Sequence, residues 1–288
     1  ASGATLAAVL TMRERALAWA GNRAGLPGQA RLRVYASAEV HTSVDRAIWI
    51  AGIGQENLVR IPTQGPLRAM DTQALARQIA EDRAAGYLPA GIVACTGGTG
   101  TGACDDIGAV AAVAQAEALF LHVDAAWAGA AMICPEYRAL WTGIEAADSV
   151  VFNPHKWLGT QFDLSAHFIK RPEDLTRTLA IQPEYLKTHG ADGIINYSEW
   201  SVPLGRRFRA LKLWFLLRAY GLDGLRGMIR NHVSWSQALA ERLRGTPGFE
   251  IRKIEDKMGI RAVPVVETHF DNVRVPISNL LGGRPGSG

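Results

Sequence analysis

The sequence predicts an α/β fold in which a mainly parallel sheet is flanked by helices. Short apolar segments alternate with helical segments between residues 31 and 170, as in repeated strand–helix–strand units. A glycine-rich turn over residues 97–103 stands between one strand and the next helix, and polar residues follow three of the strands. Because parallel strands end at one edge of their sheet, we expect these residues to meet where α/β proteins bind ligands.

Each element follows from hydrophobic periodicity. Apolar residues at helical spacing, among them Leu6, Val9 and Leu10, predict a first helix from the start of the chain. The expected strands cover residues 31–35, 58–61, 91–95, 119–124, 150–153 and 165–170, and the expected helices cover 43–53, 71–85 and 106–117. Helical patterns return at 206–219 and 222–243. Beyond Gly248 the chain changes to short extended segments at 250–254 and 263–270.

Composition excludes several classes of protein. The chain has 288 residues, 48% of them hydrophobic and 20% charged, which is typical of a globular protein and not of a disordered, collagen-like or coiled-coil chain. The longest uncharged run, residues 84–104, holds six glycines and a proline, so it does not predict a membrane span. No signal-peptide pattern opens the chain, and a cytoplasmic location is therefore expected.

Cysteine spacing and charge argue against a metal site and against a nucleic-acid partner. Cys95, Cys104 and Cys134 show neither Cys-x-x-Cys spacing nor a neighbouring histidine cluster, so we predict reduced thiols and no metal site. The formal net charge is +4, and basic residues cluster only within 206–212. A nucleic-acid surface needs a longer basic stripe, so this cluster predicts a solvated or anion-contacting face.

Lys156 is the first candidate for chemistry. It lies in Asn153-Pro154-His155-Lys156-Trp157, directly after an apolar strand. A lysine between a proline and a tryptophan can be partly desolvated, and desolvation favours the neutral amine that forms a Schiff base. The alternative is a surface lysine beside a turn proline.

Asp124 and His41 are further candidates. Asp124 ends a strand and precedes two alanines, so a flat group could approach the backbone there and its pyridinium nitrogen could pair with the carboxylate. A helix-capping or buried, paired aspartate is the alternative. His41 follows a strand and precedes a helix; it could stack on an aromatic cofactor ring, or serve as a cap or a core residue.

The glycine-rich turn supports a competing hypothesis. Gly98, Gly100 and Ala103 satisfy the permissive G-x-G-x-x-A spacing of dinucleotide-binding proteins, and Asp124 follows at the end of the next strand. A nicotinamide-dinucleotide-binding oxidoreductase that uses the turn from Gly97 to Ala103 therefore stays open. Nothing in such an enzyme calls for the segment around Lys156.

Taken together, the motifs resemble the pyridoxal-phosphate-dependent group II amino-acid decarboxylases, from Ala1 to about Ile251. The most specific motifs are His122-Val123-Asp124-Ala125-Ala126, Asn153-Pro154-His155-Lys156-Trp157 and Pro203-Leu204-Gly205-Arg206-Arg207-Phe208-Arg209. The branch of aromatic-L-amino-acid decarboxylases looks most similar. The resemblance implies the large domain of a fold-type-I transferase, pyridoxal 5'-phosphate as cofactor, an amino-acid substrate of the aromatic class, and a homodimer.

The resemblance also implies roles for individual residues. Lys156 would carry the cofactor as an aldimine, and Asp124 would pair with the pyridine nitrogen. His41 would stack on one face of the ring and Ala126 would pack under the other. Tyr185 would protonate the carbanion after CO2 leaves, assisted by His155. The remaining cofactor contacts implied are Ala1, Ser2 and Asn153 near the phosphate, and Cys95 at a position that is commonly threonine in the family.

Two departures from the family pattern are expected to matter. The chain starts without methionine and inside the family's fold, so we predict a truncated N-terminus, and an inactive truncated scaffold is a third possible interpretation. We predict a cofactor-binding large domain over 1–213, the start of an incomplete small C-terminal domain over 214–251, and a chimeric tail over 252–288. From about residue 253 the tail resembles acyl-CoA dehydrogenases, and we expect its extended segments to lack sheet partners.

Overall fold

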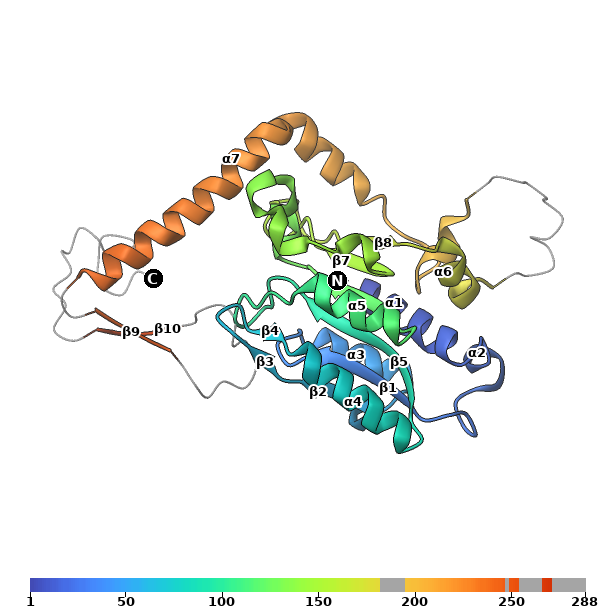
Figure 1. The fold of residues 1–288 in the computed structure, drawn as a ribbon. Coiled ribbons are helices and arrows are strands. Elements are labelled where there is room, and N and C mark those ends of the chain that lie inside the picture. Colours follow the sequence, from blue (N-terminus) through green and yellow to red (C-terminus); the bar gives the residue numbers. More distant parts are fainter. Residues whose placement is uncertain (182–194, 247–248, 254–265, 271–288) are drawn as a thin grey trace.

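A six-stranded sheet forms the centre of the protein (Figure 1). The computed structural model describes residues 1–181, 195–246, 249–253 and 266–270. In spatial order the strands are β2 (Leu58–Ile61), β1 (Leu32–Ser37), β5 (Leu88–Cys95), β6 (Phe120–Asp124), β7 (Ser149–Phe152) and β8 (Ala166–Ile169). The first five run parallel and β8 pairs antiparallel with β7, so the mainly parallel sheet is confirmed.

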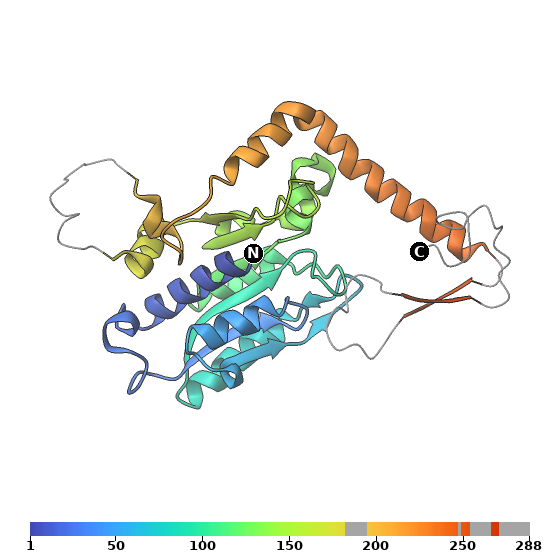
Figure 2. The ribbon, with the colours of Figure 1, turned by 180° about the vertical axis from the view of Figure 1, so that it is seen from behind.

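Helices cover both faces of this sheet (Figures 1 and 2). They are α1 (Ser2–Ala16), α3 (Ser43–Ile50), α4 (Thr72–Ala84) and α5 (Ile107–Ala116). Residues of α1 and α3 share one buried cluster with Val93 of β5, whereas residues of α4 and α5 share another with its neighbour Ile92. Successive strand residues point to opposite faces, so both faces carry apolar side chains, as a parallel sheet between helices requires.

Aspartates determine where two of these helices begin. The Asp71 carboxylate accepts the N–H groups of Gln73 and Ala74, each at 2.9 Å, and Asp106 accepts that of Ala109 at 3.0 Å. Both aspartates are extended N-caps and not helical residues. The helices therefore begin one residue later than the hydrophobic pattern predicts.

Several shorter elements accompany the main strands and helices. They are α2 (Gly21–Ala24), η1 (Gln55–Asn57), the hairpin of β3 (Thr63–Gln64) and β4 (Ala69–Met70), η2 (Ala128–Ile133), η3 (Pro135–Trp141), η4 (Ile144–Ala146), α6 (Pro172–Leu179) and η6 (Tyr197–Trp200). Within the ranges that the structure describes, no helix has both the length and the apolar character needed to cross a membrane.

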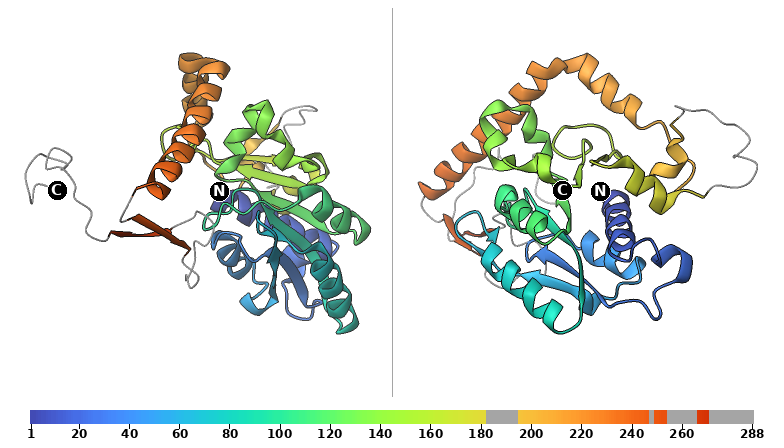
Figure 3. Two further views of the ribbon diagram at one scale, coloured as in Figure 1. Left: turned by 60° about the vertical axis from the view of Figure 1, so that its left-hand side comes forward. Right: turned by 45° about the vertical axis from the view of Figure 1, so that its right-hand side comes forward.

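The long helix α7 (Ala210–Arg244) extends past the sheet (Figure 3). Two helices were predicted over 206–219 and 222–243, and the break between them corresponds to Gly221, whose φ of 64° kinks the helix. The predicted start at 206 is wrong, because the segment before Ala210 is not helical. Leu225 and Ile229 anchor α7 by packing in a buried cluster with residues of η2.

A two-stranded antiparallel ladder lies apart from the sheet. It joins β9 (Phe249–Lys253) to β10 (Val266–Phe270). The expectation that the extended segments near the C-terminus lack sheet partners is therefore wrong: each strand satisfies part of its backbone hydrogen bonding with the other. The pairing also connects the segment expected to end the decarboxylase-like region with the segment expected to belong to the tail.

Candidate active site

The candidate residues converge because β1, β5, β6 and β7 are parallel and adjacent. Cys95 and Asp124 are register partners at the carboxyl ends of β5 and β6. Asn153 directly follows β7, and its N–H donates to the Ala126 carbonyl at 2.9 Å. Polar residues therefore meet at the carboxyl edge of the parallel strands, as the sequence predicts.

Asp124 is a buried carboxylate with one oxygen still available. Its side chain is 6% exposed, and Oδ1 accepts the N–H of Ala126 at 3.0 Å. Among the described residues, no donor reaches Oδ2. Oδ2 is not one of the fully buried atoms without a partner, so it can be reached from the sheet edge, and a free carboxylate oxygen there favours a ligand that brings a proton or a positive charge.

Lys156 lies in a tight turn after β7. Its N–H donates to the Asn153 carbonyl at 2.9 Å, and its own carbonyl accepts the Gly159 N–H at 3.1 Å. The lysine side chain is exposed, so the predicted partial desolvation is wrong for this structure. The reason is that the neighbouring Trp157 ring stacks on Trp127, with ring centroids 4.8 Å apart, instead of covering the lysine.

The N-terminus of α1 lies at the same edge. The N–H groups of Ser2 and Gly3 precede the first intrahelical hydrogen bonds, which run from Ala4 and Thr5 to the Ala1 carbonyl. Such free N–H groups and the helix dipole favour an anion. The Ala1 nitrogen donates to Ser165 Oγ, which in turn donates to Asn153 Oδ1 at 2.7 Å. Ser165 was not singled out in the sequence analysis, because serine carries no signal without its partners.

His41 is both a capping residue and an exposed ring. Its Nδ1 accepts the N–H of Ser43, the first residue of α3, at 3.0 Å, which confirms the capping interpretation. The ring is exposed in the loop that follows β1. Ala126, at 8% exposure, is buried two residues after Asp124. Capping fixes His41 at the edge without using its ring face, so stacking on a ligand stays compatible with the structure.

Cys95 contacts a buried carboxylate that the sequence analysis missed. Asp105 accepts the N–H of Cys95 and that of Met70, each at 2.7 Å. Burial raises the pKa of the Cys95 thiol well above its usual value and raises the pKa of Asp105 to about 6. The only sequence signal was the pair Asp105-Asp106, of which one caps a helix and the other supports β5.

Of the two proton-donor candidates, His155 and Tyr185, only His155 lies among the described residues. His155 lies in the Lys156 turn, and its Nδ1 is hydrogen-bonded to the Leu164 backbone. Burial lowers the pKa of His155 from its usual value, which favours the neutral ring. Tyr185 lies outside the described residues, so its predicted role stays a prediction.

The glycine-rich turn is closed on itself. The N–H groups of Gly97 and Gly98 both donate to the Ala103 carbonyl, at 2.8 and 2.9 Å, and are therefore not free for a phosphate. The following helix α5 is capped by the carboxylate of Asp106, which would repel an anion. This geometry disfavours the dinucleotide hypothesis.

An open pocket of about 440 Å³ adjoins the N-terminus of α1. Ala1, Gly3 and Ser165 line one side, and Arg206, Arg207 and Arg209 line the other. Arg209 pairs with Asp163 at 3.1 Å. The basic cluster predicted to contact an anion therefore lies beside a helix N-terminus that favours one.

The residues present fit pyridoxal phosphate. The group is a flat ring with a basic nitrogen, an aldehyde and a phosphate, and each has a counterpart at this edge. Asp124 offers a carboxylate oxygen without a donor among the described residues, Lys156 an exposed amine, and α1 free N–H groups beside arginines. Small residues at Ala125 and Ala126 leave room for a flat ring. Among the described residues, no group of histidine, cysteine or carboxylate side chains could hold a metal ion.

Comparisons with known proteins show which proteins the chain resembles. The chain is 43% identical over 259 residues to the aromatic-L-amino-acid decarboxylase of Sus scrofa, which covers 87% of this chain and 52% of that protein. It is 37% identical over 270 residues to a phenylacetaldehyde synthase of Arabidopsis thaliana, covering 92% of the chain and 54% of the relative. The chain spans about half the length of these curated relatives.

A solved structure is similar over the same region. The crystal structure of Oryza sativa TDC with PLP and tryptamine superposes with a TM-score of 0.81 at 37% identity, covering 88% of this chain and 52% of that one. The match is consistent with the fold-type-I arrangement. Residues 1–263 match the conserved domain of pyridoxal-dependent decarboxylases. Since this match covers most of the sequence, the chain belongs to the pyridoxal-dependent decarboxylase family.

Proposed function

We propose that the protein binds pyridoxal 5'-phosphate and decarboxylates an aromatic L-amino acid to its amine and CO2. The observation that carries the proposal is the buried Asp124 carboxylate with its unpaired Oδ2, at the edge that also holds Lys156 and the N-terminus of α1. The similarity to an aromatic-L-amino-acid decarboxylase and to a tryptophan decarboxylase supports the aromatic substrate class.

The bound cofactor would supply a protonated pyridine ring that accepts the electron pair released when the Cα–carboxylate bond breaks. Asp124 Oδ2 would hold a proton on the ring nitrogen. The Lys156 amine would hold the cofactor through its aldehyde. The first turn of α1, with Ser2 and the Ala1 backbone, would bind the phosphate beside Asn153.

The remaining residues orient the reacting bond and deliver the proton. His41 would stack on one face of the cofactor ring, and Ala126 would pack under the other. Tyr185 donates the proton to Cα, with His155 in support because burial keeps its ring neutral. Asp105, which accepts the backbone N–H of Cys95, supports the strand end beside Asp124. We also propose a homodimer, as the resemblance implies, since Lys156 is exposed and reaches its working environment only when further protein covers it.

The test is trapping of the cofactor on one lysine. Purified protein is mixed with pyridoxal phosphate, its visible absorbance is recorded, and the complex is reduced with borohydride and mapped by mass spectrometry. We expect a bound-cofactor absorbance band and a pyridoxyl group on Lys156, with both lost in Lys156→Ala. A label on another lysine would refute the assignment. A protein that leaves the cofactor free would favour the inactive scaffold, or the oxidoreductase if it bound NADH instead.

The product is tested through Tyr185. The relatives include decarboxylases and a phenylacetaldehyde synthase, so amine and aldehyde are both possible products of this family. In Tyr185→Phe, amine formation should slow by at least about 100-fold, the lower end of the contribution of one general acid. Molecular oxygen should then oxidise the decarboxylated substrate, and hydrolysis should yield aldehyde and ammonia while the oxygen is reduced to hydrogen peroxide. Unchanged amine output would assign the proton donor elsewhere, with His155 next.

The division of the chain is also a proposal. We retain a large domain over 1–213, the start of a small domain over 214–251 and a tail over 252–288 with acyl-CoA dehydrogenase-like sequence from about residue 253. The family match to residue 263 argues for a later boundary than the sequence motifs suggested. No flavin function is assigned to the tail.

A further inference from the structure

Two tryptophans stack beside the carboxyl edge of the sheet. The rings of Trp127 and Trp157 have centroids 4.8 Å apart and planes within 10° of parallel. Trp127 lies just after the strand that ends at Asp124, and Trp157 directly follows Lys156. The stack therefore joins the loop of the proposed pyridine-nitrogen partner to the turn of the proposed cofactor-linked lysine.

The same stack is tied to α7. Trp157 Nε1 donates a hydrogen bond to His232 Nδ1 at 3.2 Å. His232 follows Leu225 and Ile229 at helical spacing, and both of these are buried against the cluster around η2. The exposed imidazole is therefore carried by an anchored face of the helix, and its hydrogen bond ties the Trp157 ring to α7 at the protein surface.

The glycine-rich turn contacts the stack from a third side. A Cβ at Gly97 would lie 3.1 Å from Trp127 Cε3 and would also collide with the Ala128 Cβ. Only glycine allows the turn to approach Trp127 this closely, and its φ of +76° is in the left-handed region that glycine favours. Three loops of the candidate active site thus meet on one aromatic pair.

We propose that Trp127, Trp157 and His232 form a positioning cluster that orients Lys156. This rests on the proposed function, in which Lys156 holds the cofactor. Among the described residues, no hydrogen bond restrains the Lys156 amine, and its side chain is exposed. The turn therefore sets the point from which the lysine side chain extends, and the stack of Trp157 on Trp127 holds that turn against the Asp124 loop.

The experiment compares variants that break the cluster with matched controls. Trp127→Leu and Trp157→Leu remove the stack, and His232→Leu removes the hydrogen-bond acceptor. His232→Asn keeps an acceptor near the position of Nδ1. Trp214→Phe removes an exposed tryptophan of α7 that contacts Phe215 and not the stack, so it controls for the loss of one indole.

Two readouts separate positioning from simple packing. The far-ultraviolet circular dichroism of cofactor-free protein should show the exciton couplet of a tryptophan pair, lost in Trp127→Leu and Trp157→Leu and kept in Trp214→Phe. With pyridoxal phosphate added, the pH midpoint of the absorbance change of the Lys156-linked cofactor should shift in the cluster variants. Their apparent cofactor affinity should fall by about 2- to 10-fold, the range expected for one aromatic pair. His232→Asn should restore wild-type values that His232→Leu loses.

Two results would overturn the positioning role alone. One is a wild-type pH midpoint and cofactor affinity in variants that have lost the couplet. The other is a wild-type spectrum without a couplet. If the wild-type protein took up no pyridoxal phosphate on Lys156, the proposed function would fail, and the role assigned to the cluster would fail with it. That outcome is distinguishable because it affects the wild type and not only the variants.

Discussion

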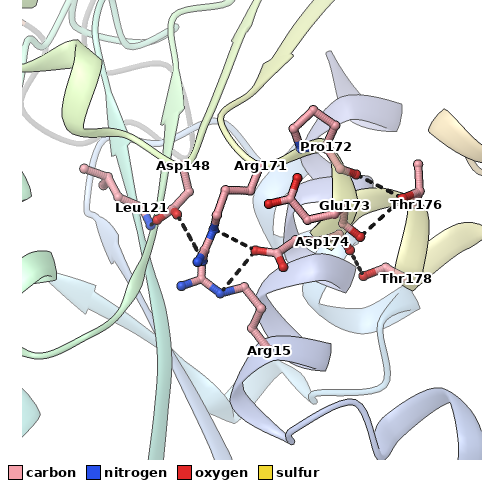
Figure 4. A network of polar contacts seen from close by, with 9 residues as sticks. All are labelled: Arg15, Leu121, Asp148, Arg171, Pro172, Glu173, Asp174, Thr176 and Thr178. Atoms are coloured by element: carbon pink, nitrogen blue, oxygen red, sulfur yellow. Dashed lines mark hydrogen bonds and ion pairs between the residues drawn. The ribbon is translucent and has the colours of Figure 1, made fainter. Parts of the chain in front are cut away.

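The two ends of helix α1 lie at opposite edges of the sheet, and their surroundings differ in one respect. At the C-terminal end, Arg15 pairs with Asp148 at 2.8 Å and lies 3.7 Å from Asp174 (Figure 4). Arg171 pairs with Asp174 at 3.0 Å. The second oxygen of Asp148 accepts the Leu121 N–H at 2.9 Å. Two guanidinium groups and two carboxylates thus form one network of ion pairs, and the network joins α1, α6 and the starts of β6 and β7.

At the N-terminal end the polar groups are left incomplete. The N–H groups of Ser2 and Gly3 precede the helical hydrogen bonds, and one oxygen of the buried Asp124 has no donor among the described residues. Because Ser2 and Gly3 are exposed, their N–H groups can be reached by solvent or by a ligand, and they add nothing to the packing of the fold. The difference teaches that one helix can serve two purposes: its C-terminal end holds the fold together, while its N-terminal end offers the groups that the proposed function needs.

The strongest way to break the ligand-binding end is Asp124→Asn. The amide keeps the shape of the side chain but removes the charge that holds a proton on the pyridine nitrogen. We expect turnover to fall by at least about 100-fold, equivalent to about 2.7 kcal/mol in barrier, while the cofactor can still bind. Steady-state assays of amine formation measure this. Near-normal turnover would refute the role of Asp124, and loss of NADH binding would support the dinucleotide alternative.

The matching change at the other end is Asp148→Ala. It leaves Arg15 without its nearest carboxylate and the Leu121 N–H without an acceptor. We expect the free energy of unfolding to fall by about 2 kcal/mol, because a partly buried charge and a backbone donor lose their partner. Urea denaturation measures this loss. Under conditions in which the variant is fully folded, its affinity for the cofactor should equal that of the wild type. A large drop in affinity would mean that the two ends of α1 are energetically coupled.

The comparison also explains what the sequence could and could not predict. The strand ends were predictable because apolar runs stop at Cys95, Asp124 and Asn153, and parallel topology then brings these residues together. The ion-pair network around Arg15 was not predictable, because its members are far apart in the sequence and none of them lies in a recognisable sequence motif. The exposure of Lys156 was mispredicted because Trp157 packs on Trp127, a contact that depends on how two loops fold.

Between the two edges, a histidine pair gives the sheet its sensitivity to acid. Ser149 of β7 lies between His122 of β6 and His167 of β8. Its Oγ is 2.8 Å from His122 Nδ1 and 2.8 Å from His167 Nε2. Burial lowers the pKa of His122 to about 3 and that of His167 to about 4. Both rings are therefore neutral in the folded protein at pH values where histidines of the unfolded chain already bind protons.

Stability should accordingly be lost as the pH falls from about 6.5 toward 4, because the unfolded state takes up protons that the folded state does not. We expect His167→Gln, whose amide can still bond to Ser149, to lessen this dependence by about 1.4 kcal/mol per pH unit, the value for one proton. Urea denaturation at a series of pH values gives the slope. An unchanged slope would show that His167 is protonated in the folded state over this range.

The smallest effect is expected from deleting residues 254–288, which removes β10 and leaves β9 without its partner. The pair lies outside the six-stranded sheet, and two antiparallel strands alone are marginally stable in water, so their loss should change the free energy of unfolding of the main body by less than about 1 kcal/mol. The absorbance of bound cofactor should be unchanged as well, since none of the proposed contacts lies beyond residue 253. Thermal denaturation of the deleted and full chains, with and without pyridoxal phosphate, measures both quantities. A loss of several degrees, or binding of FAD by the full chain, would show that the segment is an integrated part of the protein and that the proposed boundary near residue 253 is wrong.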